Sequence, residues 1–196
     1  MENKDYGILI ETSARHCHVT REVLDVLYGE GYELTPKKAL SQPGQYAAVE
    51  KVTVKAPKEG KDMTMSILGP CRSYTQVELA ATDARSMGFP IVVSQSGELE
   101  GTPGTTLIGP KGQVTIDKGV FVVRRHIHMI PEEAEAIGLK DGDIVSVKVP
   151  TSDKRSLIFG DVVMRVTKTA GRAMHIDTDE SNAALVPNGA IGEIIK

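Results

Sequence analysis

The sequence has few aromatic side chains: its 196 residues include no tryptophan, three phenylalanines and five tyrosines. Proteins that bind single-stranded nucleic acids without sequence preference stack the bases on aromatic rings, so this scarcity argues against such a protein. An excess of positive charge is lacking too, because 23 lysines and arginines stand against 26 aspartates and glutamates, for a net charge of −3. Binding of nucleic acids or anionic membranes draws on a basic surface. We therefore expect neither as a partner.

Long hydrophobic runs are also lacking. No stretch approaches the roughly 18 apolar residues that indicate a transmembrane helix. The first residues, MENKDYGILIETS, lack the basic and apolar regions of a secretory signal. The two cysteines, Cys17 and Cys71, form no CxxC pattern. We expect a cytoplasmic protein with free thiols, because disulfides are rare in reducing compartments.

Short runs rich in valine and isoleucine recur along the chain, separated by turn residues as in KEGKD, SGELEGTPGTT and LKDGD. Such runs are typical of β-strands. The spacing of apolar residues and the residues at the ends predict three short helices, over 20–31, 77–88 and 131–138. Many short strands with few helices predict a mainly β fold, built as two related small β-barrels capped by short α-helices.

A short internal repeat supports the two related units. The tetrapeptide RHCH at 15–18 returns as RHIH at 125–128. Each copy ends a β-like run and leads into a predicted helix with glutamate in its first turn. Two related units, each built around one such junction of strand and helix, are the simplest interpretation.

The repeats contain four of the five histidines. Side chains alternate between the faces of a strand, so His16 and His18 share one face, and so do His126 and His128. Two imidazoles roughly 6–7 Å apart along a strand suit one metal ion or two neighbouring ions, and imidazole is a good zinc ligand. The fifth, His175, lies in AMHIDTDESNAA. The pattern predicts metal binding, and strand histidines that are exposed or hydrogen-bonded without a metal are the alternative.

Other polar groups are more ambiguous. Cys17 should face away from the histidines as a small buried residue, and Cys71 lacks the partner motif of a nucleophile. Arg72 suits an anion, because its planar fork matches phosphate or carboxylate, but a surface ion pair is as common. The acidic residues of HIDTDES are interpreted as helix caps rather than cation ligands (Asp177, Asp179 and Glu180).

The segments SARHCH, LSQPGQYAAVEKVTV, ILGPCRSYTQVELAATDAR, LEGTPG, VVRRHIHM and MHIDTDESNAA closely resemble the PduL-type phosphotransacylases, known as phosphate propanoyltransferases. They occur in order from Ser13 to Ala184, nearly the whole chain. The resemblance implies transfer of an acyl group between coenzyme A and inorganic phosphate, a fold of two β-barrels capped by short helices, and a homodimer. It also implies domain boundaries, with one barrel at 16–123 and another formed by 1–15 and 124–196, completed by the N-terminal strand.

The resemblance further implies two zinc ions per chain, with coenzyme A as a substrate. Arg72 falls where the family has its phosphate-binding arginine, and we assign it the catalytic role. The implied metal ligands are His16, His18, Glu78, His126, His128 and His175. Weaker assignments to phosphate or coenzyme A binding are Ser13, Gln42, Gly44, Gln76, Ser96 and Arg165.

The predicted reaction converts a short-chain acyl-CoA, propanoyl-CoA or acetyl-CoA, and phosphate into acyl phosphate and CoA. Phosphate held by Arg72 and zinc attacks the thioester directly, since no convincing serine or cysteine nucleophile motif is present. Two alternatives are a metal-dependent thioesterase or phosphoesterase and a non-catalytic zinc-stabilised β protein. The first 12 residues lack the apolar helical stripe of a shell-targeting extension. We expect a free cytoplasmic enzyme, with the lumen of a bacterial microcompartment as the alternative.

Overall fold

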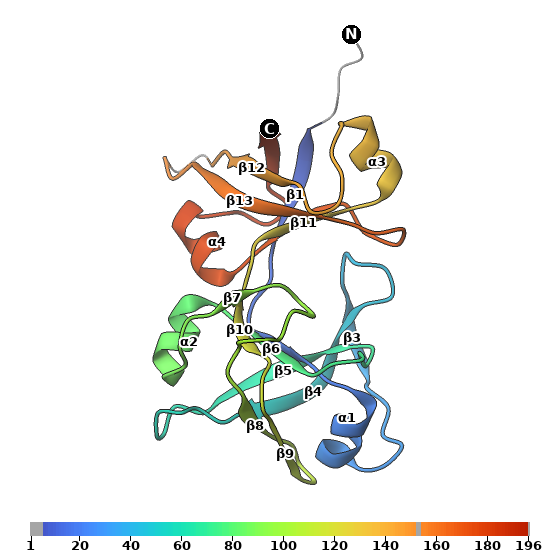
Figure 1. Ribbon diagram of the computed structural model, residues 1–196, viewed down its shortest axis with the longest axis vertical. Coiled ribbons are helices and arrows are strands. Elements are labelled where there is room, and N and C mark those ends of the chain that lie inside the picture. Colours follow the sequence, from blue (N-terminus) through green and yellow to red (C-terminus); the bar gives the residue numbers. More distant parts are fainter. Residues whose placement is uncertain (1–5, 152–153, 196) are drawn as a thin grey trace. The chain divides into compact units, whose positions relative to one another are not determined.

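The computed structural model describes residues 6–151 and 154–195 and shows two compact units (Figure 1). We call the first the barrel unit; it comprises Met1–Ser13, Ser41–Pro43 and Arg124–Lys196. We call the second the sheet unit; it comprises Ala14–Leu40 and Gly44–Val123. Both are mainly β with short helices, so the predicted fold class is confirmed. Among the described residues, no helix has the length and apolar character needed to cross a membrane.

The barrel unit is a closed barrel with strand order β1-β14-β11-β13-β12-β15. A continuous apolar core fills it, with Ile127, Met164 and Met174 fully buried. Two helices, α3 (Pro131–Ala136) and α4 (Thr178–Ala184), each follow a strand of the barrel. The strands are β1 (Gly7–Thr12), β11 (His126–Met129), β12 (Ile144–Val149), β13 (Leu157–Val166), β14 (Ala173–Ile176) and β15 (Ile191–Ile195).

The sheet unit is a curled sheet with strand order β7-β10-β6-β2-β5-β4-β8-β9, and β3 pairs with β4 outside this path. A second core lies in this unit and includes Cys17, Ile67 and Val77. Its helices are α1 (Arg21–Tyr28) and α2 (Ala81–Met87). The strands are β2 (His16–His18), β3 (Pro36–Ala39), β4 (Tyr46–Val54), β5 (Met63–Gly69), β6 (Gln76–Leu79), β7 (Val93–Ser94), β8 (Thr105–Ile108), β9 (Gln113–Ile116) and β10 (Val120–Val123).

Two of the three predicted helices are confirmed by their caps. The Thr20 side chain accepts a hydrogen bond from the Val23 amide at the start of α1, and Pro131 occupies the first turn of α3. The helix predicted over 77–88 is wrong in its first part, because residues up to Leu79 form β6 and only α2 is helical. All four residues of β6 are buried. Its residues do alternate, with polar Gln76 and Glu78 on one face and apolar Val77 and Leu79 on the other, but a run of four residues that leads directly into a helix is too short for this pattern to be separated from the helical one.

The structure extends the sequence repeat to whole strands. In the barrel unit β11 pairs with β14 and places His126 opposite His175, and in the sheet unit β2 pairs with β6 and places His16 opposite Glu78. The six strands β1, β14, β11, β13, β12 and β15 run in the same order as β10, β6, β2, β5, β4 and β8. Glu78 and His175 therefore occupy equivalent positions.

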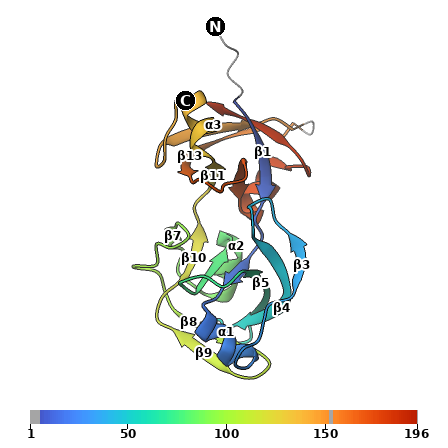
Figure 2. The same ribbon diagram turned by 90° about the vertical axis from the view of Figure 1, so that its right-hand side faces the viewer.

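The first strand of each repeat lies in the sheet of the other. β1 precedes β2 in sequence but pairs with β14 in the barrel unit, and β10 precedes β11 but pairs with β6 in the sheet unit. Figures 1 and 2 both draw β1 in blue among the orange and red strands of the barrel. Each His-x-His strand thus begins just after the chain passes from one unit to the other.

Candidate metal centres

In the sheet unit, neighbouring strands bring together His16 and His18 of β2 and Glu78 of β6. One ligand atom of each lies within 4.8 Å of the others. The Nε2 atom of His16 is 3.4 Å from Oε2 of Glu78, and Nε2 of His18 is 3.9 Å from Oε1. All three residues are buried: the exposed fraction is 5% for His16, 2% for His18 and 6% for Glu78. Three ligands that the resemblance implied thus form one buried cluster, which we call the sheet trio.

The hydrogen bonds of the two imidazoles show which nitrogen faces the carboxylate. Nδ1 of His16 lies 2.8 Å from the Ala14 carbonyl oxygen, and Nδ1 of His18 lies 3.2 Å from that of Leu68. A carbonyl oxygen only accepts, so both Nδ1 atoms donate, and in the neutral ring the lone pair is on Nε2. Both Nε2 atoms face Glu78. A cation between the two Nε2 atoms and the carboxylate would be bound by all three groups, in a space that water does not reach.

The pKa values of the two histidines move in opposite directions. Burial lowers the pKa of His18 to about 3, with His16 and Arg72 adding to the effect. For His16 burial also lowers the pKa, but the charge and hydrogen bond of Glu78 outweigh it, and the pKa is raised. His18 is therefore neutral at pH 7, as a metal ligand must be, while a metal ion at His16 would replace a proton shared with Glu78.

In the barrel unit, His126 and His128 of β11 meet His175 of β14, again with ligand atoms within 4.8 Å of one another. Nε2 of His126 is 3.1 Å from Nε2 of His128, and Nδ1 of His126 lies 2.8 Å from the Arg124 carbonyl oxygen. The contact to the carbonyl two residues upstream repeats that of His16. We call these residues the barrel trio.

Both trios fit a zinc ion by their donor atoms and spacing. Zinc favours imidazole nitrogen with one carboxylate or none, at about 2.0–2.1 Å in a tetrahedron, which places neighbouring donor atoms about 3.3 Å apart. The separations of 3.4 Å between His16 and Glu78 and of 3.1 Å between His126 and His128 are close to that value. Three protein ligands leave a fourth position for water or a substrate, as in catalytic zinc sites.

An arginine precedes each His-x-His strand and forms an ion pair with the helix that follows the third ligand. Arg15 lies 3.0 Å from Asp83 in α2, and Arg125 lies 3.1 Å from Glu180 in α4. Both carboxylates are in the first turn of their helices. The first ion pair connects the start of β2 to α2, and the second connects the start of β11 to α4. The arginines of the repeat therefore have a structural role.

Arg72 of the sheet unit is half-buried and held by two side chains. Its Nη1 donates to Ser96 Oγ at 2.9 Å, and its Nη2 donates to Gln45 Oε1 at 3.0 Å. The charge of the guanidinium helps to lower the pKa of His18, and at His16 it offsets a small part of the rise in pKa that Glu78 causes. A fixed cation beside the sheet trio is suited to an anion such as phosphate. The two partners, Ser96 and Gln45, are neutral, so among the described residues these contacts do not favour the alternative of a surface ion pair.

The weaker sequence candidates divide into two groups. Gln76 and Ser96 belong to the hydrogen-bond network of Arg72 and Glu78. Gln42 lies in the barrel unit, where its amide is bonded to the backbone N–H and C=O of Gly171 at 3.1 and 3.0 Å. The backbone N–H of Ser13 donates a hydrogen bond to the carbonyl oxygen of Ile176. Gly44 lies in an exposed turn with a φ of +76°. Arg165 of β13 pairs with His128 of β11.

The remaining interpretations can be compared with the structure directly. Cys17 is fully buried in the core, and burial raises the pKa of the Cys71 thiol, so it is not an activated nucleophile. Asp177 caps α4: its side chain accepts from the Glu180 N–H at 2.8 Å, while the Glu180 carboxylate accepts from the Asp177 N–H. The assignment to helix capping is confirmed for Asp177 and Glu180, and Asp179 lies in the first turn of the same helix.

Two residues that sequence reasoning missed lie beside the candidates. Oε2 of Glu11 on β1 is 3.1 Å from Nε2 of His175, and Gln45 orients Arg72. The repeat offers no clue to Glu11, because the equivalent position on β10 is the buried apolar Phe121. Only the long-range pairing of β1 with β14 places it there.

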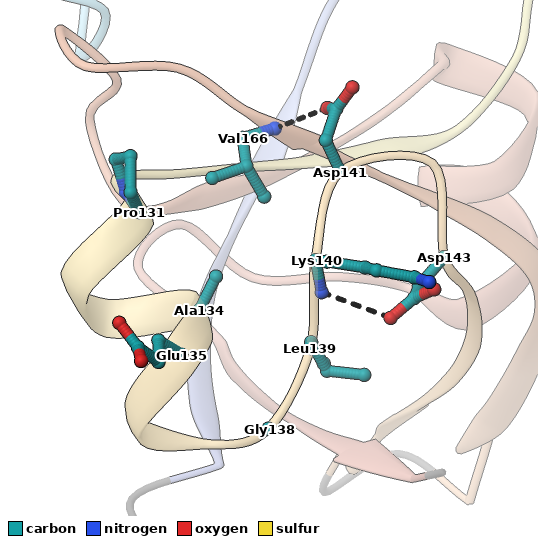
Figure 3. Close-up of a pocket in the computed structure, with 9 residues that line it drawn as sticks. All are labelled: Pro131, Ala134, Glu135, Gly138, Leu139, Lys140, Asp141, Asp143 and Val166. Atoms are coloured by element: carbon teal, nitrogen blue, oxygen red, sulfur yellow. Dashed lines mark hydrogen bonds between the residues drawn. The ribbon is translucent and has the colours of Figure 1, made fainter.

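A pocket in the barrel unit lies between α3, the following turn and Val166 of β13 (Figure 3). Two backbone N–H groups bind carboxylates here: Val166 donates to Asp141 at 2.8 Å and Lys140 donates to Asp143 at 3.0 Å. None of the candidate residues contributes to it. The lining residues are Pro131, Ala134, Glu135, Gly138, Leu139, Lys140, Asp141, Asp143 and Val166.

Comparison with known proteins gives one consistent result. The profile of a family described as phosphate propanoyltransferase matches residues 9–187. A phosphate propanoyltransferase of Thermotoga maritima is 50% identical over 193 residues, covering 98% of this chain and 91% of that protein. Proteins of the same name from Leptotrichia buccalis (49% over 194 residues, 98% and 90% covered) and Rhodopseudomonas palustris (43% over 191 residues, 97% and 83% covered) are also similar. The matched region contains both trios and Arg72.

Proposed function

The chain belongs to the phosphate propanoyltransferase family and is an acyltransferase, and from that premise we propose that it transfers a short acyl group, propanoyl or acetyl, between coenzyme A and phosphate. Arg72 binds the phosphate, and the sheet trio holds a zinc ion beside it. One observation carries this proposal: a half-buried arginine, fixed by two neutral partners, is linked by hydrogen bonds through Ser96 and Gln76 to the carboxylate of a buried His-His-Glu cluster.

The reaction requires little covalent chemistry from the protein. An oxygen of hydrogen phosphate forms a bond to the thioester carbonyl carbon, the bond between that carbon and sulfur breaks, and the phosphate proton ends on the released thiol. Acyl-CoA and phosphate thus become acyl phosphate and CoA, with no acyl-enzyme. Burial of Cys17 and the raised pKa of Cys71 agree with a direct attack, since neither thiol is poised as a nucleophile.

The side chains of the sheet unit have separate tasks in this reaction. The guanidinium of Arg72 binds the phosphate and orients an oxygen toward the acyl carbon, which lowers the entropic cost of the attack. His16, His18 and Glu78 would hold the metal. A zinc ion supplies Lewis acidity for the carbonyl and an affinity for the departing sulfur. Gln45 keeps the arginine in place.

We further propose that the barrel trio holds the second zinc ion and that the enzyme is a cytoplasmic homodimer, as the family resemblance implies. Ser13, Gly44 and Arg165 remain candidates for contacts with coenzyme A, whereas the amide of Gln42 is already occupied by Gly171. The domain boundaries at 16–123 and at 1–15 with 124–196 stay predictions of the same kind.

The test is thiol release from propanoyl-CoA and acetyl-CoA by the zinc-loaded protein, with and without inorganic phosphate. We expect release only with phosphate, and trapping with hydroxylamine should show acyl phosphate as the product. Release at the same rate without phosphate would identify a thioesterase instead. A protein that binds zinc but releases no thiol would be a structural zinc protein, and either result would overturn the proposal.

A further inference from the structure

Gln76 occupies a special place in the sheet trio although it is not one of its members. It lies two residues before Glu78 on β6, so the two side chains share a face of the strand. In the pairing with β2, Gln76 is opposite His18 and Glu78 is opposite His16. Its side chain is fully buried, with an exposed fraction of 0%.

Every polar group of the Gln76 amide is bonded within the protein. The backbone N–H of Gly97 donates to its Oε1 at 3.0 Å, which fixes the orientation of the amide because a backbone N–H only donates. Nε2 then donates to Glu78 Oε1 at 2.5 Å and to Ser96 Oγ at 2.7 Å. A buried amide with all its hydrogen-bonding groups engaged is not placed to contact a substrate. This differs from the substrate-binding role that the resemblance suggested.

The first of these bonds acts on Glu78. The Gln76 amide holds Oε1, and Oε2 faces Nε2 of His16 at 3.4 Å. A carboxylate restrained through one oxygen presents the other to a metal ion in a defined direction. This bond restricts rotation of the Glu78 side chain away from the two histidines.

The second bond acts on Ser96 and through it on Arg72. Ser96 Oγ accepts from Gln76 Nε2 at 2.7 Å and from Arg72 Nη1 at 2.9 Å. A hydroxyl oxygen has two lone pairs, so these two bonds leave the hydroxyl hydrogen to donate elsewhere. Beside the guanidinium, the hydroxyl is then a second donor for an anion.

We propose that Gln76 is a positioning residue that couples the metal carboxylate Glu78 to the phosphate-binding pair Arg72 and Ser96. The inference rests on the proposed function, in which the trio holds zinc and the arginine binds phosphate. It goes beyond that function because it states that one buried amide supports the binding of both zinc and phosphate. Loss of the amide should weaken zinc and phosphate binding together, while coenzyme A should bind unchanged to the zinc-loaded protein, in which the metal is still present for its sulfur.

The test compares Gln76→Met, which keeps the length and burial of the side chain, with Ser96→Ala. Zinc affinity is measured by competition with a chromogenic chelator, and phosphate and CoA binding by calorimetry on the zinc-loaded protein. We expect Gln76→Met to lower the affinity for one zinc ion by about 10- to 100-fold, the range for residues that hydrogen-bond to metal ligands. The affinity for phosphate should fall about tenfold. Ser96→Ala should weaken phosphate alone. In the double variant Gln76→Met/Ser96→Ala, phosphate binding should be no weaker than in Ser96→Ala, because the loss of the Ser96 hydroxyl already removes the connection between Gln76 and Arg72.

The matched control is Val77→Ala, which changes a fully buried apolar neighbour on the same strand. It should lower the melting temperature without changing either affinity. Wild-type zinc and phosphate affinities in Gln76→Met, or losses in the double variant that equal the sum of the two single losses, would overturn the inference. If Gln76→Met does not fold, unchanged phosphate binding in Ser96→Ala overturns it. These readouts need no turnover, so failure of the proposed reaction in the wild type is a separate result.

Discussion

Replacement of Arg72 by methionine is expected to lower kcat/KM for phosphate by about 10²- to 10³-fold, the usual loss when one donor to a developing anion is removed. The KM for acyl-CoA should change much less. The side chain is half-buried and held by Ser96 and Gln45 at 2.9 and 3.0 Å, so its charge is fixed before phosphate arrives. Initial rates over a matrix of phosphate and propanoyl-CoA concentrations give both constants.

Two further variants make this prediction specific. Arg72→Lys keeps the charge but loses the planar fork, and we expect a loss of about tenfold, the cost of one charge-assisted hydrogen bond. Arg85→Met removes an exposed arginine in the last turn of α2 and should leave both constants unchanged. An Arg72→Met enzyme with the wild-type dependence on phosphate would show that another group binds the anion.

Removal of the metal should abolish activity and lower stability. Dialysis against dipicolinate is expected to reduce the rate to below about 1% of the untreated enzyme, because polarisation of the thioester is lost. The melting temperature should fall as well. A ligand present at about 1,000 times its Kd stabilises the fold by about 4 kcal/mol, which for a chain of this size corresponds to a shift of roughly 10 °C.

The physical reason for the stability effect is the burial of the sheet trio. His16, His18 and Glu78 are 5%, 2% and 6% exposed, so Glu78 keeps its charge away from water. Zinc should restore both rate and stability. Magnesium should restore neither, because it prefers oxygen ligands. A protein shown to be metal-free by elemental analysis that keeps its full rate would contradict the metal role.

Local patterns were enough to predict the histidine pairs and most of the fold class. Alternation along a strand places His16 with His18 and His126 with His128, and it turns Cys17 into the core. The His-x-His pairs need no knowledge of distant contacts, because both members lie on one strand. The third ligands differ. The residues themselves did not identify Glu78, which came from the family resemblance.

Long-range pairing accounts for what the residues did not reveal. β6 opens the segment for which the residues predict a helix, so nothing local places Glu78 opposite His16 or Gln76 opposite His18. The exchange of first strands between the repeats brings Glu11 beside His175. Strand pairs between distant segments depend on the whole topology, which a periodic pattern does not contain.

The zinc content of the chain tests most directly the central claim that each unit holds its own metal centre. Elemental analysis of the wild type and of two double variants, His16→Ala/His18→Ala and His126→Ala/His128→Ala, gives the number of ions per chain. The account predicts two in the wild type and one in each variant, because the trios are built from separate strands. A single zinc in the wild type, or two in either double variant, would contradict it.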